Sequence, residues 1–239
     1  MVDLFPMTRR LFLQGSLAST VGQISGWSYG GDLGPSHWGE LAEYRLCGQG
    51  QHQSPVAVDM AQARLEPVVF NYGPVAINLL NNGRTIQQAG DSRCTLTLDD
   101  RVYQLLQFHI HTPSEHVQAG RHYPGELHFV HRHIERGALA VVGVWLTPGT
   151  EQPELATLGR YWPQQPGANA AAPRRINLAN LLPADRHLVR YSGSLTTPPC
   201  SEGVTWLMMA TPLEASVQQI DTCHRLLGDN ARPLQRPGP

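Results

Sequence analysis

Three histidines in two short apolar segments carry the chemistry that this sequence indicates most clearly. His109 and His111 stand in Gln107-Phe-His-Ile-His, and His128 stands in Glu126-Leu-His-Phe-Val. Because successive side chains of a β-strand point to opposite faces, His109 and His111 share one face if this segment is extended. A third imidazole from a neighbouring strand would complete a three-nitrogen site that leaves one tetrahedral position of zinc open. The spacing therefore predicts a catalytic zinc site rather than a structural one.

Two polar residues strengthen this interpretation. Gln107 and Glu126 each stand two positions before a candidate ligand, on the same strand face. A metal-bound imidazole usually donates its second ring N–H to an amide, carboxylate or carbonyl oxygen, which fixes the ring. An isolated His-x-His pair also occurs on ordinary polar strand faces. Three nearby histidines fit surface or core positions better than ligand positions: His116, His131 and His133.

Extended segments dominate the hydrophobic pattern and would carry these histidines. The candidate strands cover residues 68–72, 75–80, 85–88, 102–111, 126–131, 139–146, 188–191 and 204–209. Apolar residues recur at helical spacing from Ala215 to Leu227, and Gly228 follows where a C-terminal cap belongs, so a helix is expected there. A shorter helix is expected over residues 154–160. No repeat or linker divides the chain, which predicts one mostly β domain.

Composition excludes several classes of function. The chain has 239 residues and a formal net charge of -1, which does not indicate a surface for nucleic acid or other polyanions. All 18 basic side chains other than histidine are arginine. The absence of lysine excludes a Schiff-base mechanism and a phosphate-binding P-loop.

The first 25 residues differ from the rest of the chain. Thr8-Arg9-Arg10-Leu11-Phe12-Leu13 precedes a modestly apolar stretch, as in a twin-arginine export signal, and the stretch is too short and polar to span a bilayer. We therefore predict an export signal over residues 1–25, a domain over 26–239, and a periplasmic or secreted protein without a transmembrane segment. The alternative is a disordered or amphipathic tail, because no clear Ala-x-Ala cleavage site follows. Initiation at Met7 would give a signal of more usual form.

Further motifs, in order along the chain, resemble the α-class carbonic anhydrases, in particular the exported bacterial type. The similarity runs from Trp27 to about Gln235. It implies a mostly β (α+β) fold, in which a large twisted, mainly antiparallel sheet with short peripheral helices holds zinc at the floor of a conical cleft. The motifs besides the histidine segments are Gly34-Pro-Ser-His-Trp-Gly, Gln53-Ser-Pro-Val, Asn81-Asn-Gly, Ser114-Glu-His, Leu139-Ala-Val-Val-Gly-Val, Ser194-Leu-Thr-Thr-Pro-Pro-Cys and Asn230-Ala-Arg-Pro.

The reaction implied by this resemblance is the reversible hydration of carbon dioxide to bicarbonate and a proton. Zinc on His109, His111 and His128 would lower the pKa of a bound water, and the resulting hydroxide would attack the substrate. Thr196 would accept a hydrogen bond from that hydroxide and donate its own proton to Glu115, because an ionised carboxylate only accepts. Two alternatives are a catalytically silent zinc-binding interaction module and a zinc esterase.

The same resemblance assigns the surroundings of the zinc. His111 would use the main-chain carbonyl of Asn230, while Gln107 and Glu126 support the other two ligands. Carbon dioxide is small and lacks a net dipole, so its site should be an apolar wall, although composition alone would place these residues in an ordinary core. Sulfonamides and other anions should bind the zinc as inhibitors. The nominated pocket residues are Val130, Val141, Leu195, Thr197 and Trp206.

One departure from the family concerns the proton. Fast members carry a histidine after Asn-Asn-Gly, and this chain has Arg84 there. Arginine stays protonated at ordinary pH and cannot release the product proton, so turnover should be slow and depend on buffer. Tyr29, Asn82 and Gln87 would form a water network, and another histidine at the cleft rim is an alternative relay.

The C-terminus of the chain and its four cysteines give the last two predictions from the sequence. Family members usually continue through one further strand beyond Asn230-Ala-Arg-Pro, so the final strand is expected to be missing, whether the chain is truncated or naturally short. Cys47 and Cys200 match a pair that is bridged in many exported relatives. Cys94 and Cys223 have no such match and are expected to be small buried residues.

Overall fold

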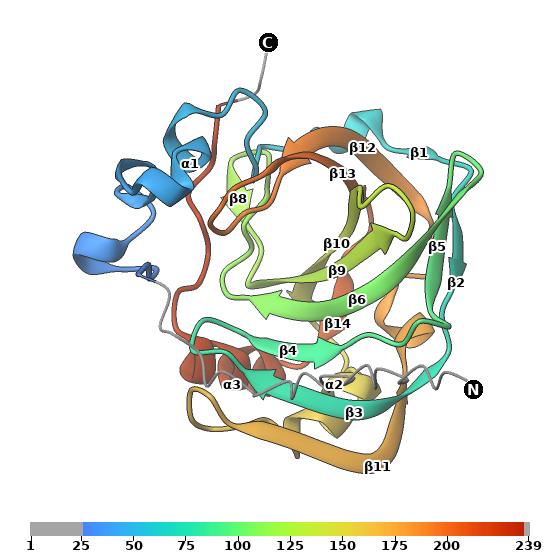
Figure 1. Ribbon diagram of the computed structural model, residues 1–239. Helices are drawn as coiled ribbons and strands as arrows, with labels where there is room; N and C mark the ends of the chain where they lie inside the picture. The colour runs from blue at the N-terminus through green and yellow to red at the C-terminus, as the bar shows by residue number, and fades with distance from the viewer. Residues whose placement is uncertain (1–25, 237–239) are drawn as a thin grey trace, which may run out of the picture.

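A twelve-stranded twisted sheet forms most of this computed structural model, which describes residues 26–236 (Figure 1). Nine of its strands follow the order β1-β12-β13-β10-β9-β6-β4-β3-β11, while β5 pairs with β6, β2 with β5, and β14 with β10. A separate hairpin pairs β7 with β8. The strands are β1 Arg64–Leu65, β2 Val69–Asn71, β3 Pro74–Asn81, β4 Ile86–Ala89, β5 Thr95–Leu98, β6 Arg101–His111, β7 Val117–Gln118, β8 Arg121–His122, β9 Gly125–His133, β10 Leu139–Pro148, β11 Asn169–Asn177, β12 His187–Ser194, β13 Glu202–Met209 and β14 Leu213–Ala215.

The central strands place the candidate ligands next to each other. In the antiparallel pair β6 and β9, His109 stands opposite His128. Strand β10 pairs antiparallel with β9, and parallel with β13 and β14. All other pairs of strands among the described residues are antiparallel, and the bridge between Ala57 and Val117 is a further, isolated parallel contact, so the prediction of a large, mainly antiparallel sheet is confirmed.

The two faces of the central strands contribute to different clusters. Phe108 and Ile110 of β6 pack into the main hydrophobic core, together with Phe129 of β9. The opposite face carries His109 and His111 and, on the adjoining strands, a smaller apolar cluster that contains Val130, Val141 and Trp206. Because β9 and β10 are covered on both faces, they are almost continuously buried, as hydrophobic runs of this length require.

Each strand predicted from the sequence overlaps a strand of the structure. The sequence did not identify the short strands β1, β5, β7, β8 and β14. It also did not identify the longer strand β11, which lies at the edge of the sheet and pairs only with β3. Its sequence, Asn169-Ala-Ala-Ala-Pro-Arg-Arg-Ile-Asn, contains a proline and two adjacent arginines, which hide the alternating pattern. An edge strand tolerates these residues because its outer backbone groups need no partner strand.

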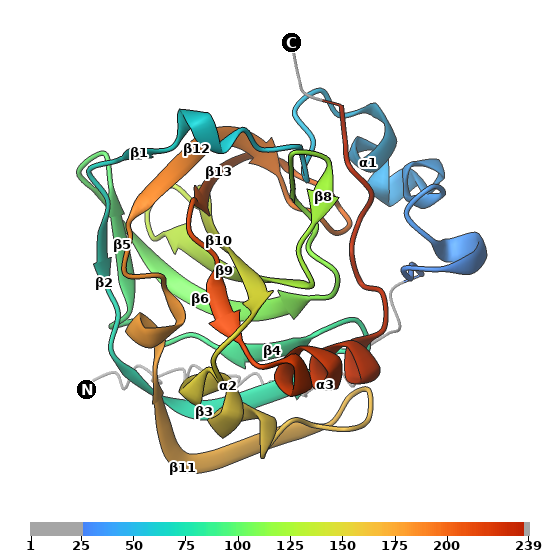
Figure 2. The ribbon, with the colours of Figure 1, turned by 180° about the vertical axis from the view of Figure 1, so that it is seen from behind.

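Within residues 26–236, three α-helices lie outside the sheet: α1 Leu46–Gln49, α2 Pro153–Gly159 and α3 Val217–Leu227. The predicted C-terminal helix is confirmed as α3. Ser216 and Gln219 form a capping box at its start, and Gly228 ends it with a φ of 64°. Helices α2 and α3 lie together near β3 and β11, as the view from behind shows (Figure 2). The shorter 3-10 helices are Gly31–Leu33, Trp38–Glu40, Ala42–Tyr44, Met60–Gln62 and Leu178–Leu181.

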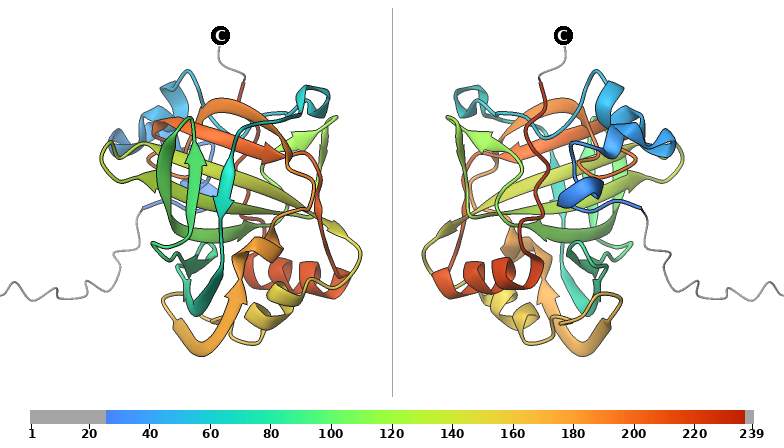
Figure 3. Two further views of the ribbon diagram at one scale, coloured as in Figure 1. Left: turned by 90° about the vertical axis from the view of Figure 1, so that its right-hand side faces the viewer. Right: turned by 90° about the vertical axis from the view of Figure 1, so that its left-hand side faces the viewer.

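After α3 the chain crosses the molecule toward α1 (Figure 3). Asn230 N donates to Thr112 O, and Gln235 N donates to Pro55 O, so this segment is anchored at both ends. No strand follows α3 within residues 228–236. The predicted export signal, residues 1–25, lies outside the described residues. Among residues 26–236, the structure has no helix with the length and apolar character needed to cross a membrane.

Candidate metal centre

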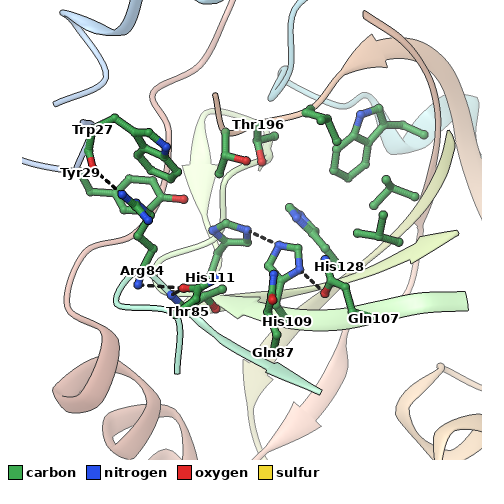
Figure 4. Close-up of a pocket in the computed structure, with 16 residues that line it drawn as sticks. Trp27, Tyr29, Arg84, Thr85, Gln87, Gln107, His109, His111, His128 and Thr196 are labelled. Atoms are coloured by element: carbon green, nitrogen blue, oxygen red, sulfur yellow. Dashed lines mark hydrogen bonds between the residues drawn. The ribbon is translucent and has the colours of Figure 1, made fainter. Parts of the chain in front are cut away.

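A cleft of about 260 Å³ opens on the face of the sheet that carries the histidines (Figure 4). His109, His111 and His128 line its floor. His111 and His128 are each only 1% exposed, and His109 is partly exposed to the cleft. The ring centroids lie 4.5 to 5.3 Å apart. The three side chains that the sequence nominated as ligands therefore converge.

Each of these histidines uses one ring nitrogen for a hydrogen bond outside the cluster. His109 Nδ1 bonds Gln107 Oε1 at 2.8 Å, His111 Nδ1 bonds Asn230 O at 2.7 Å, and His128 Nε2 bonds Glu126 Oε1 at 2.6 Å. The three partner atoms are oxygens and can only accept a hydrogen bond. In each neutral ring, the nitrogen that faces its oxygen partner therefore carries the hydrogen. The other nitrogen of each ring is left with a lone pair that faces the cluster.

This arrangement fits a zinc ion. His109 Nε2 and His111 Nε2 lie 3.0 Å apart, and two lone pairs at that distance repel each other unless a cation or proton is shared. One nitrogen from each of the three histidines lies within 4.8 Å of the others. Three imidazole nitrogens are a frequent donor set for catalytic zinc, and the outward hydrogen bonds fix their orientation.

Burial keeps two of these histidines neutral. The pKa of His109 lies well below its ordinary value because the ring is desolvated and because His111 and His128 are close. Desolvation also lowers the pKa of His111. Since a metal binds the unprotonated imidazole, these shifts favour the form that can act as a ligand near neutral pH.

Glu126 connects His128 to a further buried histidine. His116 Nδ1 also lies 2.6 Å from Glu126 Oε1, and the backbone N–H of His116 donates to Glu126 Oε2. Burial alone would raise the pKa of Glu126, but His116 and His128 outweigh it and hold this pKa well below its ordinary value. His116 Nε2 hydrogen-bonds the Tyr191 hydroxyl at 2.6 Å. His116 therefore supports Glu126 instead of facing the ligand cluster, a role that was not predicted from the sequence.

The predicted hydrogen bond between Thr196 and Glu115 is not formed. Glu115 is fully buried, and its Oε1 accepts from the Arg232 backbone N–H at 2.8 Å. Its Oε2 has no hydrogen-bond partner and is turned toward the ligand nitrogens, 3.5 Å from His111 Nε2 and 3.8 Å from His128 Nδ1. Thr196 lines the cleft and is 5% exposed. A buried carboxylate oxygen without a partner is costly, and a cation among the histidines would offset that cost.

The predicted apolar wall is present in the cleft. Strand register places Val141 of β10 beside both Val130 of β9 and Trp206 of β13. Leu195 and Thr197 follow β12, and both also line the cleft. Trp206 donates its Nε1–H to Ser194 O at 2.9 Å, so its ring is held in place without using a polar group of the cleft.

Polar residues form the other side, where Tyr29, Asn82, Arg84 and Gln87 all line the cleft as the sequence predicted. In Figure 4, Arg84 lies beside Trp27 and Tyr29. Arg84 Nη2 donates to the Trp27 carbonyl at 2.9 Å, and the guanidinium lies 4.0 Å from the centre of the Trp27 ring. The sequence assigned no cleft role to two further lining residues, Trp27 and Thr85.

A disulfide braces the loop that follows β12. Cys47 and Cys200 are bonded, as the resemblance implied, while Cys94 and Cys223 are buried and free. Arg232 also supports this region, and the sequence did not single it out, although it lies in a quoted motif. Its buried guanidinium donates to Cys47 O, Ser54 O and Gln53 Oε1. A nearly fully buried arginine is uncommon, but its burial cannot be seen in the local sequence.

Comparisons with protein families, with individual proteins and with solved structures all identify carbonic anhydrases as similar to this chain. A family model described as eukaryotic-type carbonic anhydrase matches residues 33–237. A carbonic anhydrase of Klebsiella pneumoniae is 43% identical over 216 residues, which cover 88% of this chain and 87% of the relative. A carbonic anhydrase of Nostoc sp. is 41% identical over 217 residues, which cover 87% of this chain and 82% of the relative. Among solved structures, the α-carbonic anhydrase of Thermovibrio ammonificans, in complex with the inhibitor sulfanilamide, has a TM-score of 0.84 at 43% identity and covers 88% of this chain and 95% of that one.

Proposed function

Because this chain belongs to the eukaryotic-type (α-class) carbonic anhydrase family, we propose that it catalyses the zinc-dependent, reversible hydration of carbon dioxide to bicarbonate and a proton. The convergence of one unprotonated nitrogen from each of His109, His111 and His128 at the cleft floor is the observation that carries this proposal. Zinc held there supplies a Lewis acid that lowers the pKa of a bound water.

The supporting residues fix the three histidines before any metal binds. Gln107, the Asn230 carbonyl and Glu126 each hold one ring by its outward N–H. Losing such a partner typically reduces metal affinity by 10- to 100-fold, that is, by about 1 to 3 kcal/mol. We therefore assign these residues to ligand positioning.

Thr196 is proposed to orient the reacting water. Its hydroxyl can accept a hydrogen bond from the water and donate its own hydrogen to an acceptor. The unpaired Oε2 of Glu115 is the acceptor in this proposal, and it must turn from its position near His111 to reach the hydroxyl. Donation to a carboxylate leaves the Thr196 oxygen free to accept, which selects one orientation of the water.

The wall formed by Val130, Val141, Leu195 and Trp206 is proposed to hold carbon dioxide. It lies beside the histidine cluster and has no charged side chain. An uncharged, nonpolar substrate gains more from such a surface than from fixed charges. The Thr196 backbone N–H is the proposed contact for a substrate oxygen.

Proton release is proposed to limit turnover. Apart from the three ligands, no histidine lines the cleft in the described part of the chain. Burial raises the pKa of Tyr29 well above its ordinary value, so the phenol does not exchange protons near neutral pH. Burial lowers the pKa of Arg84, but a guanidinium remains protonated across the physiological range. Buffer molecules must then carry the proton from the water in the cleft.

Stopped-flow hydration of carbon dioxide, with zinc content measured on the same sample, tests both parts of this function. We expect zinc-dependent turnover that rises with buffer concentration. Arg84→His should increase kcat at low buffer and leave kcat at saturating buffer less affected. Full zinc occupancy without hydration would contradict the enzymatic function and favour a binding module. No gain from Arg84→His at low buffer would reject the proton-transfer part alone.

The protein is further proposed to bind sulfonamide inhibitors and to act outside the cytoplasm. Sulfanilamide is bound in the Thermovibrio relative, and a zinc ion held by the histidine cluster would be its binding partner here. The Cys47–Cys200 disulfide is stable in oxidising compartments. Calorimetry with sulfanilamide, and cell fractionation of the full chain compared with an Arg9→Gln/Arg10→Gln variant, test the two proposals separately.

A further inference from the structure

The three histidines of the cluster occupy unequal positions in the sheet. His109 pairs with Gln87 of β4 on one side and with His128 of β9 on the other. His128 also lies between two strands, because β9 pairs with both β6 and β10. His111 is the last residue of β6, and the pairing of β6 with β4 ends two residues earlier, at His109. On this side, no strand of the described part of the chain pairs with the backbone at His111.

Thr85 stands where the next pair between β4 and β6 would be. In the antiparallel register that pairs Gln87 with His109, Thr85 comes opposite His111. The backbone of Thr85 is engaged in the turn before β4, because its N–H donates to Asn82 Oδ1 and its carbonyl accepts the Asn82 N–H. The side chain of Thr85 therefore remains as the group that can bond to β6.

The Thr85 hydroxyl makes this bond. Oγ1 donates to the Ile110 carbonyl at 2.7 Å, and the residue is only 7% exposed. The same carbonyl accepts from Asn230 Nδ2 at 3.1 Å. On the other side of His111, the Thr112 N–H donates to Asn230 Oδ1 at 2.7 Å. Side-chain hydrogen bonds thus replace the sheet ladder on both sides of His111 along the chain.

We propose that Thr85 is a positioning residue for the metal: its bond to the Ile110 carbonyl holds the end of β6 so that His111 faces the cluster before zinc binds. The inference rests on the proposed function for the identity of the metal. A ligand with a mobile backbone must be ordered when the metal binds, and this cost lowers affinity. Without the hydroxyl, the Ile110 carbonyl keeps only the longer bond from Asn230.

The size of the effect follows from the net value of one hydrogen bond, which corresponds to about 3- to 10-fold in an equilibrium constant. This factor appears in zinc affinity if the bond orders His111 for the metal. A bond that serves only the fold would stabilise the metal-free and zinc-loaded proteins equally, and zinc affinity would not change. Zinc affinity therefore distinguishes positioning from a general structural role.

The experiment measures the zinc dissociation constant of the full chain by competition with a chromophoric chelator. Thr85→Val replaces the hydroxyl by a methyl group and should weaken zinc binding by about 3- to 10-fold. Thr85→Ser keeps the hydroxyl and should retain most of the affinity. Thr157→Val is the matched control, because Thr157 Oγ1 donates to the Pro153 carbonyl at 3.0 Å in α2 and Thr157 does not line the cleft. This control should leave zinc affinity unchanged.

Urea unfolding with and without zinc provides a second readout. Thr85→Val should lower the free energy of unfolding more in the zinc-loaded protein than in the metal-free protein, because the variant gains less from the metal. Thr157→Val should lower it equally in both. A Thr85→Val chain that is unfolded without zinc would show that the bond serves the whole fold, and it would overturn the inference.

The outcomes separate this inference from the proposed function. Unchanged zinc affinity in Thr85→Val overturns the inference, and so does an equal loss in Thr85→Ser, which would assign the effect to packing. In both cases hydration by the unmodified chain still supports the function. Zinc affinity that depends on the Thr85 hydroxyl, in a protein without hydration activity, would support the inference and reject the function. An unmodified chain that binds no zinc would reject both.

Discussion

His131 shows how burial sets the charge of single residues on the face of the sheet opposite the cleft. The ring is fully buried, its Nε2 lies 2.6 Å from the Tyr72 hydroxyl, and its Nδ1 contacts Ala140 O at 3.3 Å. Burial lowers the pKa of His131 to about 4. A neutral ring satisfies both contacts, because it accepts from Tyr72 and donates to Ala140.

The low pKa of His131 predicts a loss of stability in mild acid. Between pH 6.5 and 4 the unfolded chain binds a proton at this residue and the folded chain does not, so stability falls as pH decreases through this range. The loss from pH 7 to pH 5 should be about 2 kcal/mol. Urea unfolding at both pH values should show a smaller loss for His131→Gln than for the unmodified chain. Equal losses in the two proteins would contradict this assignment.

Thr196 offers a second test on one residue, because the proposed role requires only its hydroxyl. Thr196→Ala should lower kcat/KM for hydration by about 100-fold, the usual effect of losing a hydrogen bond that orients a reacting group. Thr196→Ser keeps the hydroxyl and should stay within about 10-fold of the unmodified enzyme. Stopped-flow rates at equal zinc content would check this. A Thr196→Ala variant with normal rates would exclude the proposed orientation of the water.

The sequence predicts individual residues well where a local rule applies. The strand period placed His109 and His111 on one face, and the same period identified Gln107 as a supporting residue. The support of Glu126 by His116 and Tyr191 could not be predicted, because those two residues are 75 positions apart. The absence of the predicted hydrogen bond from Thr196 to Glu115 has a similar reason, which is the position of the Glu115 carboxylate. It depends on the backbone of Arg232, which is 117 positions away.

Strand β10 allows a test at the level of an element, since its alternate residues serve different functions. Val141 faces the cleft between Val130 and Trp206, whereas Val142 packs in the main core. Val141→Tyr should lower kcat/KM for hydration by at least about 10-fold by filling the substrate site, with zinc still bound. Val142→Tyr should instead destabilise the fold by about 1 to 3 kcal/mol, because it overpacks the core. Normal turnover in a stable Val141→Tyr variant would remove Val141 from the proposed wall.

The elements themselves were predictable to different degrees. Strands β6, β9 and β10 and helix α3 carry strong periodic or capping signals, and each overlaps its predicted range. Strand β11 was missed because the stabilisation of an edge strand comes from its partner and not from its own residue pattern. The parallel pairing of β10 with β13 is likewise a tertiary property that local patterns do not encode.

At the scale of the whole molecule, two long-range links hold the segment before β1 and the loop after β12 against the sheet. The Cys47–Cys200 disulfide closes a loop with a sequence separation of 153. Arg232 joins the segment after α3 to the backbone carbonyls of Cys47 and Ser54. The disulfide was expected only because the chain resembles its family, since the sequence alone does not specify cysteine pairing.

Removing the disulfide should therefore reduce both stability and activity. In the chain-entropy model a loop of this length contributes about 5 kcal/mol, so Cys47→Ser/Cys200→Ser should lower the free energy of unfolding in urea by a large part of that value. Cys200 ends the Thr196-to-Cys200 loop, and greater freedom there should also decrease kcat. Reductant should shift the unmodified chain to the values of the variant. Cys94→Ala/Cys223→Ala lacks the free thiols, so it controls for their modification and should respond to reductant in the same way as the unmodified chain. A loss below about 1 kcal/mol would mean that Arg232 and the surrounding hydrogen bonds hold the loop without the disulfide.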